Sequence, residues 1–175
     1  MDLKKYIRSI PDYPKKGILF RDITTLIKDK DAFKECIDQM SKILAKLNFD
    51  KIASIESRGF VFASALCYNL SKSLILMRKK NKLPADKYSQ EFELEYGKAT
   101  IEIHKDSIES KEKILIIDDL IATGGTAEAG AKLVEKSGGT VSGFMFVINL
   151  FDLGGVKLLE NKGYKTFSLI DFPGH

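Results

Sequence analysis

The sequence contains few of the residues that build disulfide frameworks or protein-held metal sites. Among its 175 residues are two cysteines, Cys36 and Cys67, and two histidines, His104 and His175. The cysteines lie in apolar helical patterns without CxxC spacing, and the histidines lack metal-ligand spacing. We therefore expect both cysteines to fill the core, and we expect no metal held by histidines. A metal that arrives with a bound phosphate is compatible with this composition.

Long hydrophobic runs and clusters of one charge are also missing. No apolar run reaches the ~20 residues of a membrane-spanning helix. Residues 1–17 mix charged and apolar side chains, without the apolar core of a signal peptide. The net charge is +4, but Lys and Arg are scattered, so small anions are better candidate ligands than nucleic acid. We expect a cytoplasmic protein that binds neither membrane nor nucleic acid.

The remaining composition is that of a folded domain. Hydrophobic residues make up 44% and charged residues 30% of the chain, which argues against disorder and collagen-like repeats. A chain of this length can bury about 70% of the surface that its unfolded form exposes. We therefore expect residues 1–175 to form a single domain with its own core.

Helix-like and strand-like patterns alternate along the chain. In order, they predict a helix over about 29–47, a strand over 51–55, a helix over 60–70, a strand over 73–77, a hairpin over 91–103, a strand over 113–117, a helix over 125–137, a strand over 140–148, a helix near 156–161 and a strand near 166–170. The strand over 73–77 barely alternates, so it should be buried on both faces. Residues 78–90 lack an apolar period and should form a long exposed loop.

This alternation of elements predicts an α/β fold. Consecutive strands joined by helices favour right-handed crossovers, and hence a mainly parallel twisted sheet flanked by helices. In such sheets, ligands bind at the carboxyl ends of the strands. We therefore look for function in the residues that follow each predicted strand.

One segment, KILIIDDLIATGGT at Lys113–Thr126, combines an aliphatic strand, two acids and a glycine-rich turn before a helix. The glycines let the backbone approach a ligand closely, so that N–H groups at the start of the helix can bind a phosphate. No Lys follows the glycines, which favours a monophosphate over a nucleoside triphosphate. The residues predicted to bind this phosphate are Ala122, Thr123, Gly124, Gly125 and Thr126.

Two acids, Asp118 and Asp119, end the same strand. Their carboxylates can accept hydrogen bonds from a ribose 2′,3′-diol and can hold hydrated Mg²⁺ nearby. An ordinary turn explains a lone TGGT equally well, but the strand and the acid pair together favour a ligand site. The segment Asp118–Thr126 resembles the phosphoribosyltransferase signature. That resemblance implies Mg²⁺-dependent use of phosphoribosyl pyrophosphate, with Mg²⁺ bound through the substrate and not at a dedicated protein site.

Two further strand ends carry cations that suit a pyrophosphate. Arg78, Lys79, Lys80 and Lys82 follow one strand, and Arg58 lies in the strand-to-helix turn ESRG. Taken alone, the first cluster is explained equally well as a solvated loop. Because two independent strand ends converge on an anion, we predict that pyrophosphate is bound by Arg58, Arg78, Lys79 and Lys82.

Five short motifs resemble those of adenine phosphoribosyltransferases in particular. They are GILFRD at 17–22, ESRGF at 56–60, LEYG at 94–97, NLFDLGG at 149–155 and FPGH at 172–175. Ser57 is a mild departure, because the family usually has alanine or a similarly small residue there. The resemblance spans nearly the whole chain. It implies the type I phosphoribosyltransferase fold, a small N-terminal hood over about 1–28, a mobile loop and hairpin over about 78–103, and a homodimer.

The resemblance also assigns the remaining residue roles. For adenine binding, Phe20 would stack on the base, the backbone near Leu19 would read its edge, and Arg21 would support the hood. Glu95 would handle the proton that the base loses, and Tyr96 would belong to a loop that closes over the site. Without the resemblance, Phe20 is more simply a core residue and Glu95 a solvent-facing strand residue.

The reaction implied by the resemblance is transfer of the 5-phosphoribosyl group from phosphoribosyl pyrophosphate to adenine, giving AMP and pyrophosphate in purine salvage. Two alternatives stay open. The phosphate loop does not distinguish bases, so hypoxanthine, guanine or xanthine could be the acceptor. A ligand-sensing regulator could keep the fold without catalysis, although the sequence has no added DNA-binding segment and retains Glu95.

Overall fold

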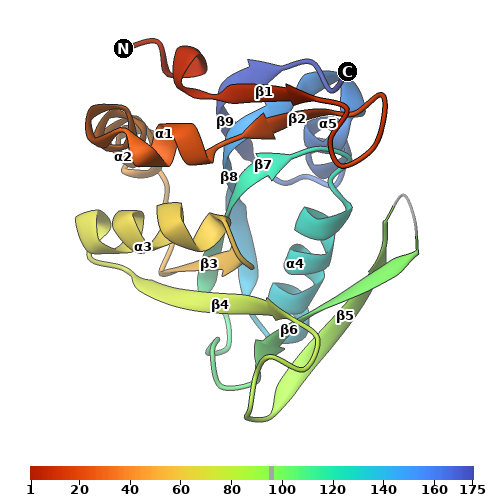
Figure 1. Ribbon diagram of the computed structural model, residues 1–175. Coiled ribbons are helices and arrows are strands. Elements are labelled where there is room, and N and C mark those ends of the chain that lie inside the picture. The colour runs from red at the N-terminus through yellow and green to blue at the C-terminus, as the bar shows by residue number, and fades with distance from the viewer. Residues whose placement is uncertain (95–96) are drawn as a thin grey trace.

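The computed structural model describes residues 1–94 and 97–175, which form a sheet covered by helices on both faces (Figure 1). In chain order, the elements are η1 (Leu3–Tyr6), β1 (Arg8–Pro11), β2 (Leu19–Asp22), α1 (Thr24–Lys28), α2 (Lys30–Leu44), β3 (Lys51–Ile55), α3 (Gly59–Leu70), β4 (Ser73–Lys79), β5 (Lys87–Glu93), β6 (Lys98–His104), β7 (Lys113–Ile121), α4 (Gly125–Lys136), β8 (Thr140–Leu150), η2 (Phe151–Leu153), α5 (Gly155–Asn161) and β9 (Thr166–Phe172).

Within these described ranges, the main sheet has seven strands in the order β5-β6-β4-β3-β7-β8-β9. The five strands from β4 to β9 run parallel, whereas the β5–β6 hairpin joins β4 in the antiparallel sense. The prediction of an α/β fold with a mainly parallel sheet is therefore confirmed. The reversal of strand order beside β3 brings the ends of β3 and β7 to the edge where such sheets bind ligands.

The central strand β7 shows why the sheet needs helices on both faces. Leu115 and Ile117 pack into the core formed with α2 and α3, while Ile114 and Ile116 pack into the core beneath α4. Successive side chains of a strand point to opposite faces, so an uninterrupted aliphatic run requires cover on each face. All four side chains are fully buried, each contributing roughly 1.5–3 kcal/mol. This burial fixes the strand that carries the acid pair.

Helix α2 follows from a local signal and carries a buried cysteine. The Asp29 carboxylate accepts hydrogen bonds from the N–H groups of Asp31 and Ala32, at 3.1 and 2.9 Å, and thereby caps the helix.

Burial raises the pKa of the Cys36 thiol to about 12 and that of Cys67 to about 11. Both cysteines are free and buried, as predicted, and their thiols stay protonated and unreactive.

Two predictions about residues 73–90 are wrong. Strand β4 is not buried on both faces, because Leu76 is 41% exposed. The segment over 78–90 is not one long loop, because β4 continues to Lys79 and β5 begins at Lys87. The reason is tertiary pairing: β6 adds to the edge of β4, so that Arg78 lies opposite Glu102. Backbone hydrogen bonds to a neighbouring strand outweigh the weak strand propensity of charged residues.

The N-terminal segment forms a small second sheet, in which β1 pairs with β2 in the antiparallel sense. We call β1 and β2 the N-terminal sheet. Its most buried anchor is Asp22, which is 6% exposed. The Asp22 carboxylate accepts hydrogen bonds from Arg8 Nε at 3.0 Å and from the Thr24 hydroxyl at 2.6 Å. Short strands with little alternation carry no clear sequence signal, so these strands were not predicted individually.

An Asp22→Asn variant is expected to lose about 2 kcal/mol of unfolding free energy near neutral pH, at ~1.4 kcal/mol for each unit of pKa. Hydrogen bonds from the Thr24 side chain and from Arg8 lower the pKa of Asp22 from 3.8 to about 2. A depressed pKa stabilises the protein fully above the unfolded value, and that stability is lost as the pH falls through the folded value. Urea unfolding from about pH 7 to pH 2 measures this difference between the two proteins.

The difference should shrink below about pH 4 and should have mostly gone near pH 2. An Asp86→Asn variant, altered at an exposed carboxylate, is the control and should match the parent protein throughout. A difference for Asp22→Asn that does not change with pH would contradict the assignment to the Asp22 charge.

Candidate active site

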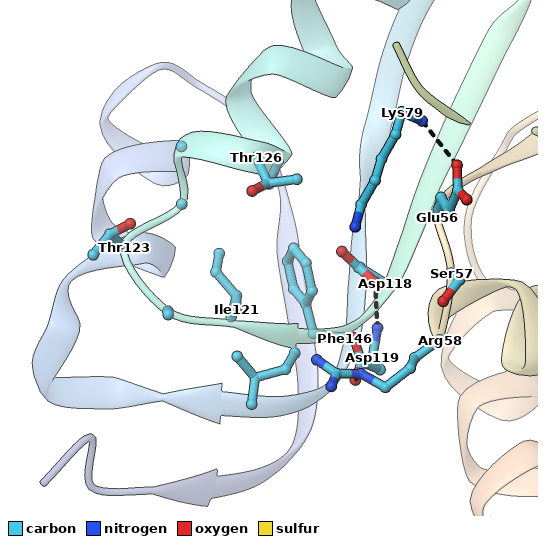
Figure 2. A pocket seen from close by; sticks show the side chains of 15 residues that line it. Glu56, Ser57, Arg58, Lys79, Asp118, Asp119, Ile121, Thr123, Thr126 and Phe146 are labelled. Carbon is cyan, nitrogen blue, oxygen red and sulfur yellow. Dashed lines mark hydrogen bonds and ion pairs between the residues drawn. The ribbon is translucent and has the colours of Figure 1, made fainter. Parts of the chain in front are cut away.

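A cavity of about 530 Å³ lies at the carboxyl ends of β3 and β7 (Figure 2). It is lined by Glu56, Ser57, Arg58, Lys79, Asp118, Asp119, Leu120, Ile121, Ala122, Thr123, Gly124, Gly125, Thr126, Ala127 and Phe146. These residues come from the turn that follows β3, from the end of β4, from β7 with the start of α4, and from β8. The structure therefore brings three of the predicted strand ends to one place.

The predicted phosphate loop forms one wall of this cavity, and all five of its residues line it. Gly124 has φ +89°, a left-handed conformation that glycine adopts without strain, and α4 begins at the next residue. A Cβ atom on Gly124 would lie 3.1 Å from the Gly155 backbone. The loop therefore packs closely against the start of α5. The first N–H groups of α4 lie where the loop borders the cavity.

The acid pair lies on the same wall, inside β7 and not after it. The Asp118 carboxylate accepts a hydrogen bond from the Asp119 N–H at 2.8 Å. Burial raises the pKa of Asp118 well above its ordinary value, and the charge of Asp119 raises it further. The Asp119 carboxylate accepts a 2.6 Å hydrogen bond from Arg58 Nε. The Arg58 guanidinium therefore pairs with Asp119, while Asp118 lies buried beside that pair.

Two of the four predicted pyrophosphate cations reach the cavity. Arg58 and Lys79 line it, whereas the Arg78 guanidinium donates a 3.3 Å hydrogen bond to Glu56 Oε1. Lys82 is exposed in the turn after β4 and does not line the cavity. The two cations that point into the cavity come from different strand ends, β3 and β4, as expected for a site that surrounds an anion.

The sequence reasoning missed several lining residues, of which Glu56 is the most informative. Although burial opposes the shift, hydrogen bonds from the Lys79 N–H and from Arg78 lower the pKa of the Glu56 carboxyl. The contact with the Lys79 N–H measures 2.8 Å. Glu56 therefore fixes the end of β4, and its place at the start of the ESRG motif was the available signal. Phe146 lines the cavity from β8 and carried no such signal.

The predicted base-binding residues lie beside the cavity and do not line it. The Phe20 ring lies 5.6 Å from the Arg58 guanidinium carbon and packs edge-on against Tyr13, with ring centroids 5.2 Å apart. Arg21 is 8% exposed and turns away, donating hydrogen bonds to Ser9 Oγ at 2.6 Å and to the Pro173 carbonyl at 2.9 Å. Neighbouring strand residues point to opposite faces, which separates these two side chains.

The two residues predicted for proton handling and loop closure, Glu95 and Tyr96, lie outside the described residues. The strand before them reaches the phosphate loop, because a Cβ atom on Gly125 would lie 3.4 Å from the Glu93 carbonyl. Strand β5 therefore ends next to the first turn of α4. No helix among the described residues is long and apolar enough to cross a membrane.

Comparison with known proteins places this site in a family. The phosphoribosyl transferase domain matches residues 23–172. An adenine phosphoribosyltransferase of Pelagibacter ubique is 68% identical over 175 residues, covering 100% of both chains. The crystal structure of an adenine phosphoribosyltransferase from Thermoanaerobacter pseudethanolicus superimposes with a TM-score of 0.93 at 47% identity, covering 98% of each chain. The chain therefore belongs to the phosphoribosyltransferase family.

Within that family, the chain is an enzyme of the adenine phosphoribosyltransferase group, as its full-length relatives indicate. A further structure, the adenine phosphoribosyltransferase of Saccharomyces cerevisiae complexed with an imino-altritol bisphosphate and adenine, is 32% identical with a TM-score of 0.89, covering 97% of each chain. The domain match begins at Ile23, directly after the N-terminal sheet. The N-terminal sheet therefore lies outside the matched family domain. It lies within the part of the chain that aligns with the full-length relatives.

Proposed function

We propose that this enzyme acts in purine salvage, transferring the 5-phosphoribosyl group of phosphoribosyl pyrophosphate to adenine and releasing AMP and pyrophosphate. The observation that carries the proposal is the single cavity in which the glycine loop, the acid pair and two cations from other strands meet. Each part suits one part of the substrate: phosphate, ribose diol and pyrophosphate. The names of the relatives support adenine as the acceptor.

In this proposal the 5-phosphate binds the N–H groups of residues 122–126, where the start of α4 favours negative charge. Asp118 and Asp119 accept hydrogen bonds from the ribose hydroxyls. Arg58 and Lys79 stabilise the charge that develops on the departing pyrophosphate, which is the most effective place for a fixed cation. Since Arg58 is paired with Asp119, its charge lies between the sugar and the leaving group.

The base would enter between the cavity and the N-terminal sheet. Phe20 offers an aromatic face close to Arg58, and the backbone near Leu19 offers hydrogen-bonding groups for one edge of adenine. Adenine N9 then forms a bond to C1′ while the C1′–oxygen bond to pyrophosphate breaks. Glu95 is the proposed acceptor of the proton that the base releases, and the segment with Tyr96 the proposed cover.

Mg²⁺ is the proposed cofactor, bound largely through oxygens of the substrate. The donor set fits, because two carboxylates at one strand end are the hard oxygen ligands that Mg²⁺ takes together with phosphates and water. When bound, the ion would neutralise charge on the pyrophosphate. The chain would contribute by placing Asp118 and Asp119 on the same wall of the cavity as the phosphate loop.

The decisive experiment incubates the protein with phosphoribosyl pyrophosphate, Mg²⁺ and an equimolar mixture of adenine, hypoxanthine, guanine and xanthine. We expect AMP and pyrophosphate as the products, with no detectable product when Mg²⁺ is replaced by EDTA. IMP, GMP or XMP as the main nucleotide would overturn the choice of base. Ligand binding without any nucleotide product, together with retention of DNA in a gel shift, would favour the regulator instead.

A homodimer is proposed from the family resemblance, and one face offers a surface for it. Val61 and Tyr68 of α3 are 40% and 88% exposed, and Leu76 of β4 is 41% exposed. Leu76 shares its sheet face with Leu74, which packs in the α3 core, so all three side chains lie on the α3 side. We expect the protein to sediment at the mass of two chains and the Leu76→Lys variant to sediment at the mass of one.

A cytoplasmic location is proposed as well.

A further inference from the structure

Two sequence motifs that the proposed chemistry does not use, NLFDLGG and FPGH, meet at Arg21. The Pro173 carbonyl accepts a 2.9 Å hydrogen bond from the Arg21 guanidinium, which also lies 4.4 Å from the Phe172 ring centroid. The Gly174 N–H donates a 2.6 Å hydrogen bond to Asp152 Oδ1. We call Arg21, Asp152 and residues 172–174 the tail clamp. It joins segments that are more than a hundred residues apart, since Arg21 and Pro173 are separated by 152 positions.

The electrostatics of the clamp make Asp152 more than a partner of Gly174. Burial lowers the pKa of the Arg21 guanidinium, and the nearby charge of Asp152 opposes that shift. A buried cation needs such compensation, because an unbalanced charge is costly inside a protein. Asp152 thus stabilises both halves of the clamp: it holds the backbone at Gly174 and it favours the charged form of Arg21.

The position of Arg21 in β2 links the clamp to the proposed base site. Phe20, the preceding residue, points to the opposite face of the N-terminal sheet and toward Arg58. The N-terminal sheet is separate from the main sheet and shares no strand pairing with it in the described residues. Contacts other than strand pairing therefore help to set its distance from the cavity, and Arg21 supplies such contacts on the face opposite Phe20.

We propose that the tail clamp is a positioning device for the base: Asp152 and residues 172–174 hold Arg21, and through Arg21 they fix Phe20 at the height where it can stack on adenine. This inference rests on the proposed function. It assigns positioning roles to Asp152 and to the FPGH motif, and it places Arg21 behind the base and not in contact with it. Among the described residues, the hydrogen bonds of the clamp go neither to the phosphate loop nor to the acid pair.

The test compares steady-state kinetics of Asp152→Ala with those of the parent enzyme. We expect the KM for adenine to rise about five- to tenfold, the effect of one lost charged hydrogen bond. The KM for phosphoribosyl pyrophosphate and kcat should stay within about twofold. Asp152→Asn keeps an oxygen that can accept a hydrogen bond from the Gly174 N–H but loses the charge beside Arg21, so it should recover only part of the loss. Glu160→Ala, at an exposed acid of α5, is the matched control.

A parallel rise in both KM values, or no rise in either, would overturn the proposal. A second measurement does not depend on activity: amide hydrogen exchange of residues 8–22 should quicken in Asp152→Ala, while that of β3 should not change. If the parent enzyme makes no AMP, the proposed function fails while exchange still tests the clamp. If AMP forms and exchange of residues 8–22 is unchanged, the clamp fails alone.

Discussion

An Asp119→Asn variant is expected to fold normally and to lose at least about 100-fold in kcat/KM, the usual cost of one preorganised charged contact in an active site. Asp119 is 6% exposed and accepts a 2.6 Å hydrogen bond from Arg58. The substitution removes the carboxylate that would receive the ribose hydroxyls, and it frees Arg58 from its partner. The first change would weaken binding of the sugar, and the second would disturb stabilisation of the leaving group.

Folding should survive this substitution for an electrostatic reason. The charge of Asp119 is one of the causes, after burial, that raise the pKa of Asp118, so a neutral side chain relieves repulsion. The Arg58 side chain is 47% exposed and can be hydrated when it loses its partner. Steady-state assays and thermal melting measure the two effects. Asp106→Asn, at the opposite edge of the sheet, is the control, and unchanged kinetics for Asp119→Asn would remove the sugar-site assignment.

A Gly155→Ala variant is expected to raise the KM for phosphoribosyl pyrophosphate at least about tenfold, because it displaces the phosphate loop from behind. A Cβ atom at this position would lie 2.4 Å from the Ala122 carbonyl oxygen and 2.9 Å from the Gly124 nitrogen. Both are backbone atoms of the loop and cannot rotate away. The Gly155 N–H also donates a 3.0 Å hydrogen bond to the Ala122 carbonyl, which the displacement would weaken.

The adjacent glycine gives a matched control for this substitution. Gly154 has φ +79°, and a Cβ atom there would meet no atom within 4 Å, so Gly154→Ala strains the backbone without striking the loop. We expect Gly154→Ala to cost about 1–2 kcal/mol of stability with the substrate KM unchanged. Equal KM values for the two variants would show that Gly155 acts through stability alone. Initial-rate kinetics and urea unfolding of both variants make the comparison.

The sequence predicted the elements whose signals are local. The helix that follows Asp29 and the strand over 51–55 were placed correctly, because a capping side chain and a run of apolar residues depend on neighbours in the chain. The strand expected to end at Ile117 continues to Ile121, because β8 pairs with it beyond that point. The polar end of β4 resembles a loop in sequence for the same reason, since pairing with β6 is not visible from composition.

The candidate site likewise has parts that the sequence predicts and parts that it does not. The segment Lys113–Thr126 could be recognised because strand, acids, glycines and helix follow one another in sequence. The contacts of Arg21 with Pro173 could not, because they depend on which face a short strand presents and on residues far apart in the chain. Glu56 was missed since its role is to hold the N–H of Lys79, a residue of another strand.

The sequence by itself determined the fold class, the glycine loop and the acid pair as candidate sites, and, through the resemblance of its motifs, the family. These properties depend on residue types at short spacing, which the chain carries before it folds. Only the tertiary structure decided that Arg58 and Lys79 face the cavity while Arg78 turns to Glu56, and that Arg21 lies behind Phe20. Those outcomes depend on strand order and on the face that each side chain takes, and both are set by long-range packing.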